Sequence, residues 1–211
     1  MYMKQLKHVF GTIFLLLIIQ NAFAQGNENL KYNNIGVYPL TITGDGAGLG
    51  LYYEGALSKT GKTSVILPVK YLVERNNLYD MNTGYYDKRS KNFFNFAPGM
   101  KFYPGRVDRV FSFAFGPSLL YSYGTFTDSY NDNVYPGSYM LYNRTEHSLG
   151  FLANSYIHLT FSKQFVMGFD MGFGVKYLKV TKANNPNINV PTEREVFVPT
   201  GQFSFSFAYK F

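Results

Sequence analysis

The sequence predicts an all-β protein, an eight-stranded antiparallel up-and-down transmembrane β-barrel. Three observations support this fold class. Large apolar residues alternate with small or polar ones, at a period of two, along most of the chain. Tight turns and long polar connections alternate between the expected strands. No stretch of about 20 apolar residues follows the first 24 positions, so membrane-spanning helices are not expected.

The composition excludes several other classes. The 211 residues include 19 tyrosines and 21 phenylalanines but no cysteine, and only 16% are charged. A disordered chain would be poor in aromatic residues and rich in charge. The absence of cysteine excludes a disulfide scaffold and a cysteine-ligated zinc site. The mean hydropathy of −0.14 shows that the chain is not strongly apolar on average.

Residues 1–24 have the features of a cleaved secretory signal peptide. Lys4 and Lys7 precede an apolar run at 9–19, and a small-x-small cleavage site follows at 22–24. An uncleaved membrane anchor is the alternative, but the run is short for crossing a bilayer. We therefore expect a barrel domain at 25–211. Without Lys4 and Lys7 the net charge falls from +7 to +5, and for an exported chain this charge does not indicate a nucleic-acid partner.

The eight strands are expected at 34–43, 47–57, 63–75, 93–104, 109–125, 144–161, 165–179 and 196–211. The faces of the first strand cannot be assigned from its pattern. The last strand is the clearest, because every second residue from 203 to 211 is aromatic and small or polar residues stand between them. The large residues of the other strands are Leu49, Leu51 and Tyr53; Val65, Leu67, Val69, Tyr71 and Val73; Phe94, Phe96, Met100 and Phe102; Phe111, Phe113, Phe115, Leu119, Tyr121 and Tyr123; Leu149, Phe151, Ala153, Ile157, Leu159 and Phe161; and Phe165, Met167, Phe169, Met171, Phe173, Val175 and Tyr177.

The connections between the strands differ in length. Residues 58–62, 104–108 and 162–164 form tight turns, and the connection near 44–46 is also short. Residues 76–92, 126–143 and 180–195 are long and polar and are predicted to be loops. Long loops at one end and short turns at the other are typical of an outer-membrane barrel.

The large apolar face is predicted to meet lipid. A soluble lipocalin-like barrel would instead turn this face inward and carry Lys, Glu and Thr outside. The opposite face consists mainly of Gly, Ser, Ala and Asn, which fit a narrow lumen, and the large face carries no charge on the seven assigned strands. From Phe111 to Tyr121 a tilted strand rises roughly 25 Å, the height of the apolar band of such barrels.

Outward tyrosines fall at the edges of this band and indicate aromatic girdles without tryptophan. Those near the long loops are Tyr71, Tyr121, Tyr123 and Tyr177, and those near the short turns are Tyr53 and Tyr209.

The charged and ionisable residues expected in the lumen are Glu54, Lys70, Glu74, Lys101, His158, Asp170, Lys176 and Lys210. Buried charges require partners. Counting from the turns places Glu54, Lys101 and His158 at a similar depth, and Lys70 with Asp170 nearer the middle. These residues would either form salt bridges that fill a structural barrel, together with Tyr52, Tyr103, Leu120 and Tyr156, or line an ion path.

The signal peptide, the eight alternating strands and the terminal Phe211 resemble the small outer-membrane β-barrel proteins of Gram-negative bacteria, the OmpA/OmpX-like class. Segments 52–57 and 101–105 also look similar to uncharacterised barrels of Bacteroidetes-type bacteria. The resemblance implies an outer-membrane location, contact with lipid and lipopolysaccharide, and assembly by the barrel assembly machinery. It also implies that Phe207, Tyr209 and Phe211 form the C-terminal assembly signal.

No catalytic, metal or cofactor site is predicted. A lipid-modifying hydrolase would need an oriented base beside its nucleophile. Only His147 and His158 follow the signal peptide, and Ser148 points to the opposite strand face from His147 despite the adjacent Glu146. Four tyrosines of the second long loop are candidates for protein or glycan contacts: Tyr130, Tyr135, Tyr139 and Tyr142.

The sequence therefore favours a non-enzymatic barrel with a structural, adhesion or envelope-complex accessory role, and its specificity is expected in the long extracellular loops. An extracellular or envelope protein is a possible partner. The alternatives are a narrow pore or transporter for small solutes or hydrophobic molecules and, more remotely, the hydrolase.

Overall fold

The computed structural model describes residues 33–58, 60–80, 85–105, 110–131, 139–162, 164–183 and 192–211. The predicted signal peptide at 1–24 lies outside these ranges. The described residues form ten strands: β1 (Asn33–Thr43), β2 (Gly46–Ala56), β3 (Thr63–Asp80), β4 (Tyr85–Phe96), β5 (Gly99–Phe102), β6 (Phe111–Asn131), β7 (Tyr139–Thr160), β8 (Phe165–Ala183), β9 (Glu193–Glu195) and β10 (Val198–Lys210). Within the same ranges, no helix has the length and hydropathy needed to cross a membrane.

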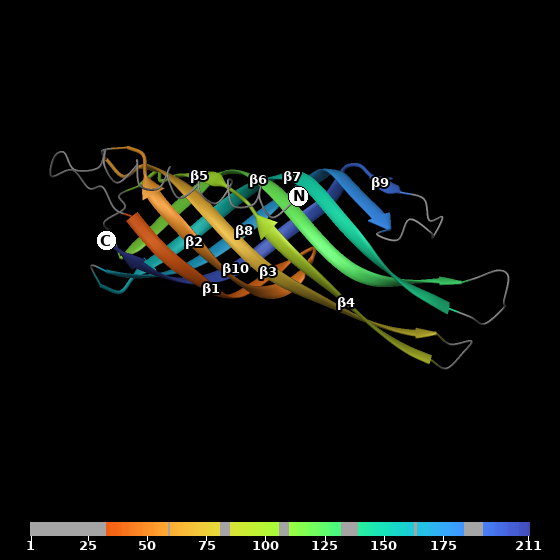
Figure 1. The fold of residues 1–211 in the computed structure, drawn as a ribbon. Helices are drawn as coiled ribbons and strands as arrows, with labels where there is room; N and C mark the ends of the chain where they lie inside the picture. The colour runs from red at the N-terminus through yellow and green to blue at the C-terminus, as the bar shows by residue number, and fades with distance from the viewer. Residues whose placement is uncertain are drawn as a thin grey trace, which may run out of the picture.

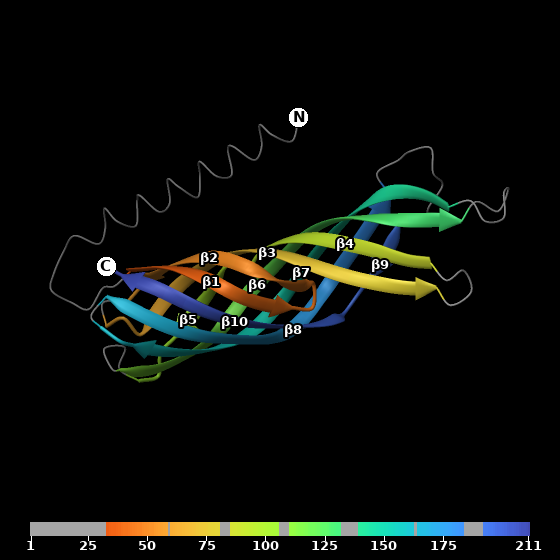
Figure 2. The same cartoon turned by 90° about the horizontal axis from the view of Figure 1, so that it is seen from below.

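The strands close into an antiparallel barrel (Figures 1 and 2). β10 pairs with β8 on one side and with β1 on the other, which leaves no open edge along the barrel wall. β4 and β5 both pair with β3 on one side and with β6 on the other, so together they occupy one strand position of the barrel. β9 and β10 both pair with β8, one after the other along its length, and they occupy another. The ten segments thus fill eight barrel positions, which confirms the predicted fold class.

The strands are strongly inclined to the barrel axis. Following paired residues from Thr43 once around the wall returns to β1 about ten residues away. In an eight-stranded barrel, a stagger of this size corresponds to a tilt of roughly 40°. The strands can therefore be long while the barrel remains narrow.

A bulge in β1 explains why its faces could not be read from the sequence. Ile35 and Val37 point outward, and so do Leu40 and Ile42, because the pairing with both neighbouring strands shifts by one residue around Pro39. Proline cannot donate to the ladder, and such bulges reverse the alternation that follows. All eight strands therefore present apolar residues to the outside.

The predicted long loops at 76–92 and 126–143 are mostly strand, so these boundaries were wrong. β3 and β4 run to Asp80 and from Tyr85, and β6 and β7 run to Asn131 and from Tyr139. Likewise, β8 continues to Ala183. The hairpins project beyond the β1–β2 turn at the end of the barrel away from the C-terminus (Figure 1). In these extensions the apolar alternation ends, which removes the signal that marked the rest of the strands.

Candidate functional site in the lumen and at the hairpin end of the barrel

Glu54 lies at the centre of a buried hydrogen-bond cluster near the short-turn end. Its Oε1 accepts from Ser64 Oγ and from Tyr103 OH, each at 2.7 Å. Its Oε2 accepts from Lys101 Nζ at 2.8 Å and from Asn34 Nδ2 at 3.4 Å. Both side chains of the Glu54–Lys101 pair are only 1% exposed. The carboxylate therefore has four donors from three other strand positions, and they hold it in one place.

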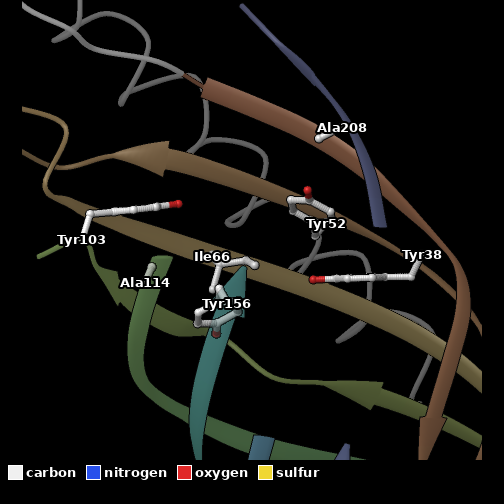
Figure 3. Packing of buried hydrophobic residues seen from close by; sticks show 7 residues of the cluster. All are labelled: Tyr38, Tyr52, Ile66, Tyr103, Ala114, Tyr156 and Ala208. Atoms are coloured by element: carbon white, nitrogen blue, oxygen red, sulfur yellow. The ribbon is translucent and has the colours of Figure 1, made fainter. Parts of the chain in front are cut away.

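Lys101 is enclosed by rings from several strands. Its Nζ lies 3.3 Å from His158 Nε2, 4.3 Å from the centre of the Tyr156 ring and 5.6 Å from that of Tyr52. Figure 3 shows the surrounding tyrosines of different strands pointing into a shared space. Aromatic faces stabilise a desolvated ammonium group. The structure thus brings together Glu54, Lys101 and His158, which the sequence places at one depth.

The second expected pair, Lys70 and Asp170, does not form a direct salt bridge, because the ring of Tyr38 lies between the two side chains. Tyr38 donates its hydroxyl to Asp170 Oδ2 at 2.8 Å, while Lys70 Nζ lies 4.9 Å from the centre of the same ring. Lys70 donates instead to Gln202 Oε1 and Ser204 Oγ, each at 2.9 Å. Tyr38 comes from the strand whose faces could not be assigned, so its place between the two charges was not predicted.

Asp45 is a lumen residue that sequence reasoning missed. It lies in the β1–β2 turn, is 6% exposed, and forms a salt bridge with Lys176 of β8. Its Oδ2 also accepts from Asn95 Nδ2 at 3.2 Å and from Ser122 Oγ at 2.9 Å. Lys176 was expected in the lumen, but its partner Asp45 was not, because a turn residue lies outside the alternating pattern that assigns strand faces. The turn is thereby tied to the opposite wall.

Two of the expected lumen charges lie at the two ends of the barrel interior. Glu74 is above the β1–β2 turn, and its side chain is 29% exposed and lies 3.4 Å from Lys91 across the β3–β4 pair. Lys210 is half-buried at the short-turn mouth and borders a cavity of about 20 Å³. Asn34, Tyr103 and His158 also line this cavity, which has room for about one water molecule.

Side chains fill the barrel at the level of these clusters. Tyr38, Tyr52 and Tyr156 are 2%, 5% and 3% exposed, and Leu120 and Leu152 pack together above them. A water-filled passage would leave the side chains along it accessible to solvent. The low exposure of these residues from different strands therefore indicates a closed lumen.

Ion pairs also line the inner face above the tyrosine girdle. Arg144 lies 2.9 Å from Glu193, and Lys179 lies 3.2 Å from Glu195 and 3.8 Å from Glu146. Burial raises the pKa of the Glu146 carboxyl, and the charge of Lys179 offsets only part of that effect. Burial lowers the pKa of Lys179, but the carboxylates of Glu146 and Glu195 together outweigh this effect and raise that pKa above its ordinary value.

The girdle tyrosines lie on the outer face. Tyr71, Tyr121, Tyr123, Tyr177 and Tyr209 are 50%, 37%, 39%, 49% and 41% exposed, respectively. Tyr53 is half-buried and donates its hydroxyl to Asn33 Oδ1 at 3.0 Å. The residues of the expected assembly signal, Phe207, Tyr209 and Phe211, are also exposed on this face.

Of the four candidate contact tyrosines, Tyr142 is the one whose side chain the structure describes. Tyr142 lies in β7 and is only 6% exposed, so its prediction as an accessible loop residue was wrong. Tyr130 and Tyr139 lie in β6 and β7, and Tyr135 is outside the described residues.

His147 and Ser148 lie on opposite sides of the wall. His147 is exposed between Tyr121 and Tyr123, and its Nδ1 is 3.0 Å from the Tyr121 hydroxyl. Ser148 points inward and is 1% exposed. This arrangement does not place the hydroxyl beside the imidazole. Among the described residues, no group of three or more acidic or histidine side chains is placed to hold a metal ion.

Comparisons with solved structures agree with the barrel geometry. A major outer membrane protein from Thermus thermophilus aligns with a TM-score of 0.54 at 13% identity, covering 86% of this chain and 99% of that one. Neisserial surface protein A aligns with a TM-score of 0.47 at 10% identity, covering 86% of this chain and 97% of that one. The E. coli outer membrane protein W aligns with a TM-score of 0.45 at 18% identity, covering 88% of this chain and 100% of that one.

The chain therefore has the fold of the small outer-membrane β-barrel proteins, as the sequence pattern indicated. At these identities the likeness concerns the fold alone. Neither a protein-family model nor a curated protein matches the chain.

Proposed function

We propose that this protein is a non-conducting, non-enzymatic barrel of the bacterial outer membrane, which anchors extended β-hairpins at the cell surface. The closed lumen is the observation that carries this proposal. The Glu54–Lys101 cluster, the tyrosines above it and the Asp45 turn lie at successive levels of the barrel interior. A structural, adhesion or envelope-complex accessory role follows, with specificity in the extracellular hairpins.

The outer surface supports the membrane location. Large apolar side chains are exposed on all eight strands, including Leu51, Phe113 and Phe173 at 62%, 42% and 74%. Exposed apolar surface on this scale marks contact with lipid or with partner proteins. Between the two tyrosine girdles, the described outward-facing positions carry no Asp, Glu, Lys or Arg, and such a charge would cost about 2–4 kcal/mol at the bilayer midplane.

Conductance in planar bilayers tests the closed lumen. We expect the purified, folded protein to give no steady channel currents, and the mobility shift between unheated and heated samples verifies that the barrel is folded. Steady currents from wild-type protein would overturn the proposal and favour the narrow-pore alternative.

Trimming the hairpins tests where the specificity lies. In a deletion strain, a variant in which a short turn replaces residues 76–89 should restore detergent resistance as well as wild-type does if the barrel itself supports the envelope. The same variant should lose surface binding if the hairpins act in adhesion. A trimmed variant that restores both properties would contradict a role for this hairpin.

A further inference from the structure

The two faces of the sheet differ in charge above the tyrosine girdle. On the inner face, the carboxylates of Glu193 and Glu195 lie against Arg144 and Lys179. Glu146 also points inward and is buried. Among the described residues of β7, β8 and β9 at this level, the acidic side chains thus all belong to the inner face.

The outer face of the same strands carries exposed basic side chains instead. His147 of β7 pairs across the sheet with Val180 of β8, which pairs in turn with Arg194 of β9. Lys182 lies two residues beyond Val180 on the same side of β8. His147, Lys182 and Arg194 are exposed. Within the described part of the chain, the ion pairs at this level join Arg144 to Glu193 and Lys179 to Glu195 and Glu146, and none of them includes Lys182 or Arg194.

This basic patch, formed by His147, Lys182 and Arg194, adjoins the lipid-facing surface. Tyr123 is the cross-strand partner of His147 and belongs to the girdle. Lys182 lies five residues beyond Tyr177 along β8, which is roughly 12 Å higher along the barrel axis. Phosphate headgroups occupy this zone in a membrane whose apolar core ends at the tyrosines.

We propose that the basic patch binds the phosphate groups of outer-leaflet lipid, with phosphorylated lipid A as its ligand. Continuity with the apolar belt favours a membrane lipid, because its acyl chains can lie on the belt while its phosphate reaches the lysine and the arginine. An arginine fork binds a phosphate in a bidentate manner, and a nearby lysine adds a compact positive charge. This inference rests on the outer-membrane location given under the proposed function.

Lipid retention measured by native mass spectrometry tests the patch. Purified protein is released from mixed micelles that contain phosphatidylcholine and either phosphorylated lipid A or dephosphorylated lipid A with the same acyl chains. We expect wild-type protein to retain the phosphorylated form at least threefold better, and the Lys182→Gln/Arg194→Gln variant to retain both forms equally. Each single substitution should lose part of the preference.

Lys62→Gln is the matched control, because Lys62 is an exposed lysine in a short turn at the other end of the barrel. It should retain the full wild-type preference. Equal retention of the two lipids by wild type, an unchanged preference in the double variant, or the same loss in Lys62→Gln would each overturn the proposal. The heat-dependent mobility shift checks that every variant is folded. Channel currents would refute the closed lumen without affecting this result, so the two proposals fail separately.

Discussion

Removing the ammonium group of Lys101 should strongly destabilise the barrel. Lys101→Met keeps most of the side-chain volume but leaves the Glu54 carboxylate, 1% exposed, without its cation. Losing one partner of a buried ion pair costs about 3–5 kcal/mol, because the remaining charge stays desolvated. Ser64 and Tyr103 still donate to the carboxylate, which places the expected loss toward the lower end of that range.

The double variant Glu54→Gln/Lys101→Met separates the ion pair from the packing around it. Glu54→Gln alone leaves the buried Lys101 without the carboxylate that contacts it and should also destabilise by a few kcal/mol. Removing both charges relieves both penalties, so the double variant should be more stable than the sum of the single losses predicts. We expect a coupling energy of about 2 kcal/mol or more, roughly a 30-fold effect on the folding equilibrium.

Urea-dependent folding in phospholipid vesicles measures these free energies. The chain has no tryptophan, so tyrosine fluorescence and the electrophoretic mobility of unheated samples report folding. Lys62→Met changes an exposed lysine and should stay within about 0.5 kcal/mol of wild type. A coupling energy below about 0.5 kcal/mol would refute the view that Glu54 and Lys101 stabilise each other.

Two further outcomes follow from the structure. Gly116→Leu should abolish folding, because a Cβ at this inward position would overlap the carbonyl oxygen of Met100 on the neighbouring strand; a normal mobility shift in unheated samples would contradict this. Glu146→Gln should raise the urea midpoint at pH 8 relative to wild type and have less effect at pH 4. Burial raises the pKa of this carboxyl, so the folded state binds its proton more tightly and wild type loses stability as pH rises through that pKa. An equal shift at both pH values would show that the carboxylate charge is not responsible.

The alternation of residues predicted the barrel because each face of a membrane strand has a different solvent. Phe111, Phe113 and Phe115 are all more than 40% exposed, while Ser112 and Ala114 between them are buried. The same alternation placed Glu54 and Lys101 inward, and counting from the turns was sufficient to bring them to one depth. Where the two faces of a strand meet different environments, the period of two therefore predicts which way each side chain points. Counting from the turns then gives its approximate height along the barrel axis.

The features that the sequence did not reveal lie outside the regular strands, or where the alternation of large apolar and small residues is interrupted. Asp45 is in a turn, and its contact with Lys176 depends on the path of the chain over the lumen. The sequences of the β3 and β6 extensions lack the regular alternation of large apolar and small residues that marks the strands within the apolar band. Pro39 reverses the alternation within β1, and this hid the inward direction of Tyr38.

The closed lumen follows from large side chains set against glycines, rather than from small residues alone. A Cβ on Gly36 would collide with the ring of Tyr52, and one on Gly124 would collide with the ring of Phe93. The many small inward residues therefore do not leave a channel, because they make room for a few large side chains from other strands. Among the described residues, a lumen filled in this way offers little internal surface to a ligand. Under the proposed function, selectivity therefore belongs to the outer wall and the hairpins, which are the parts that the proposed experiments change.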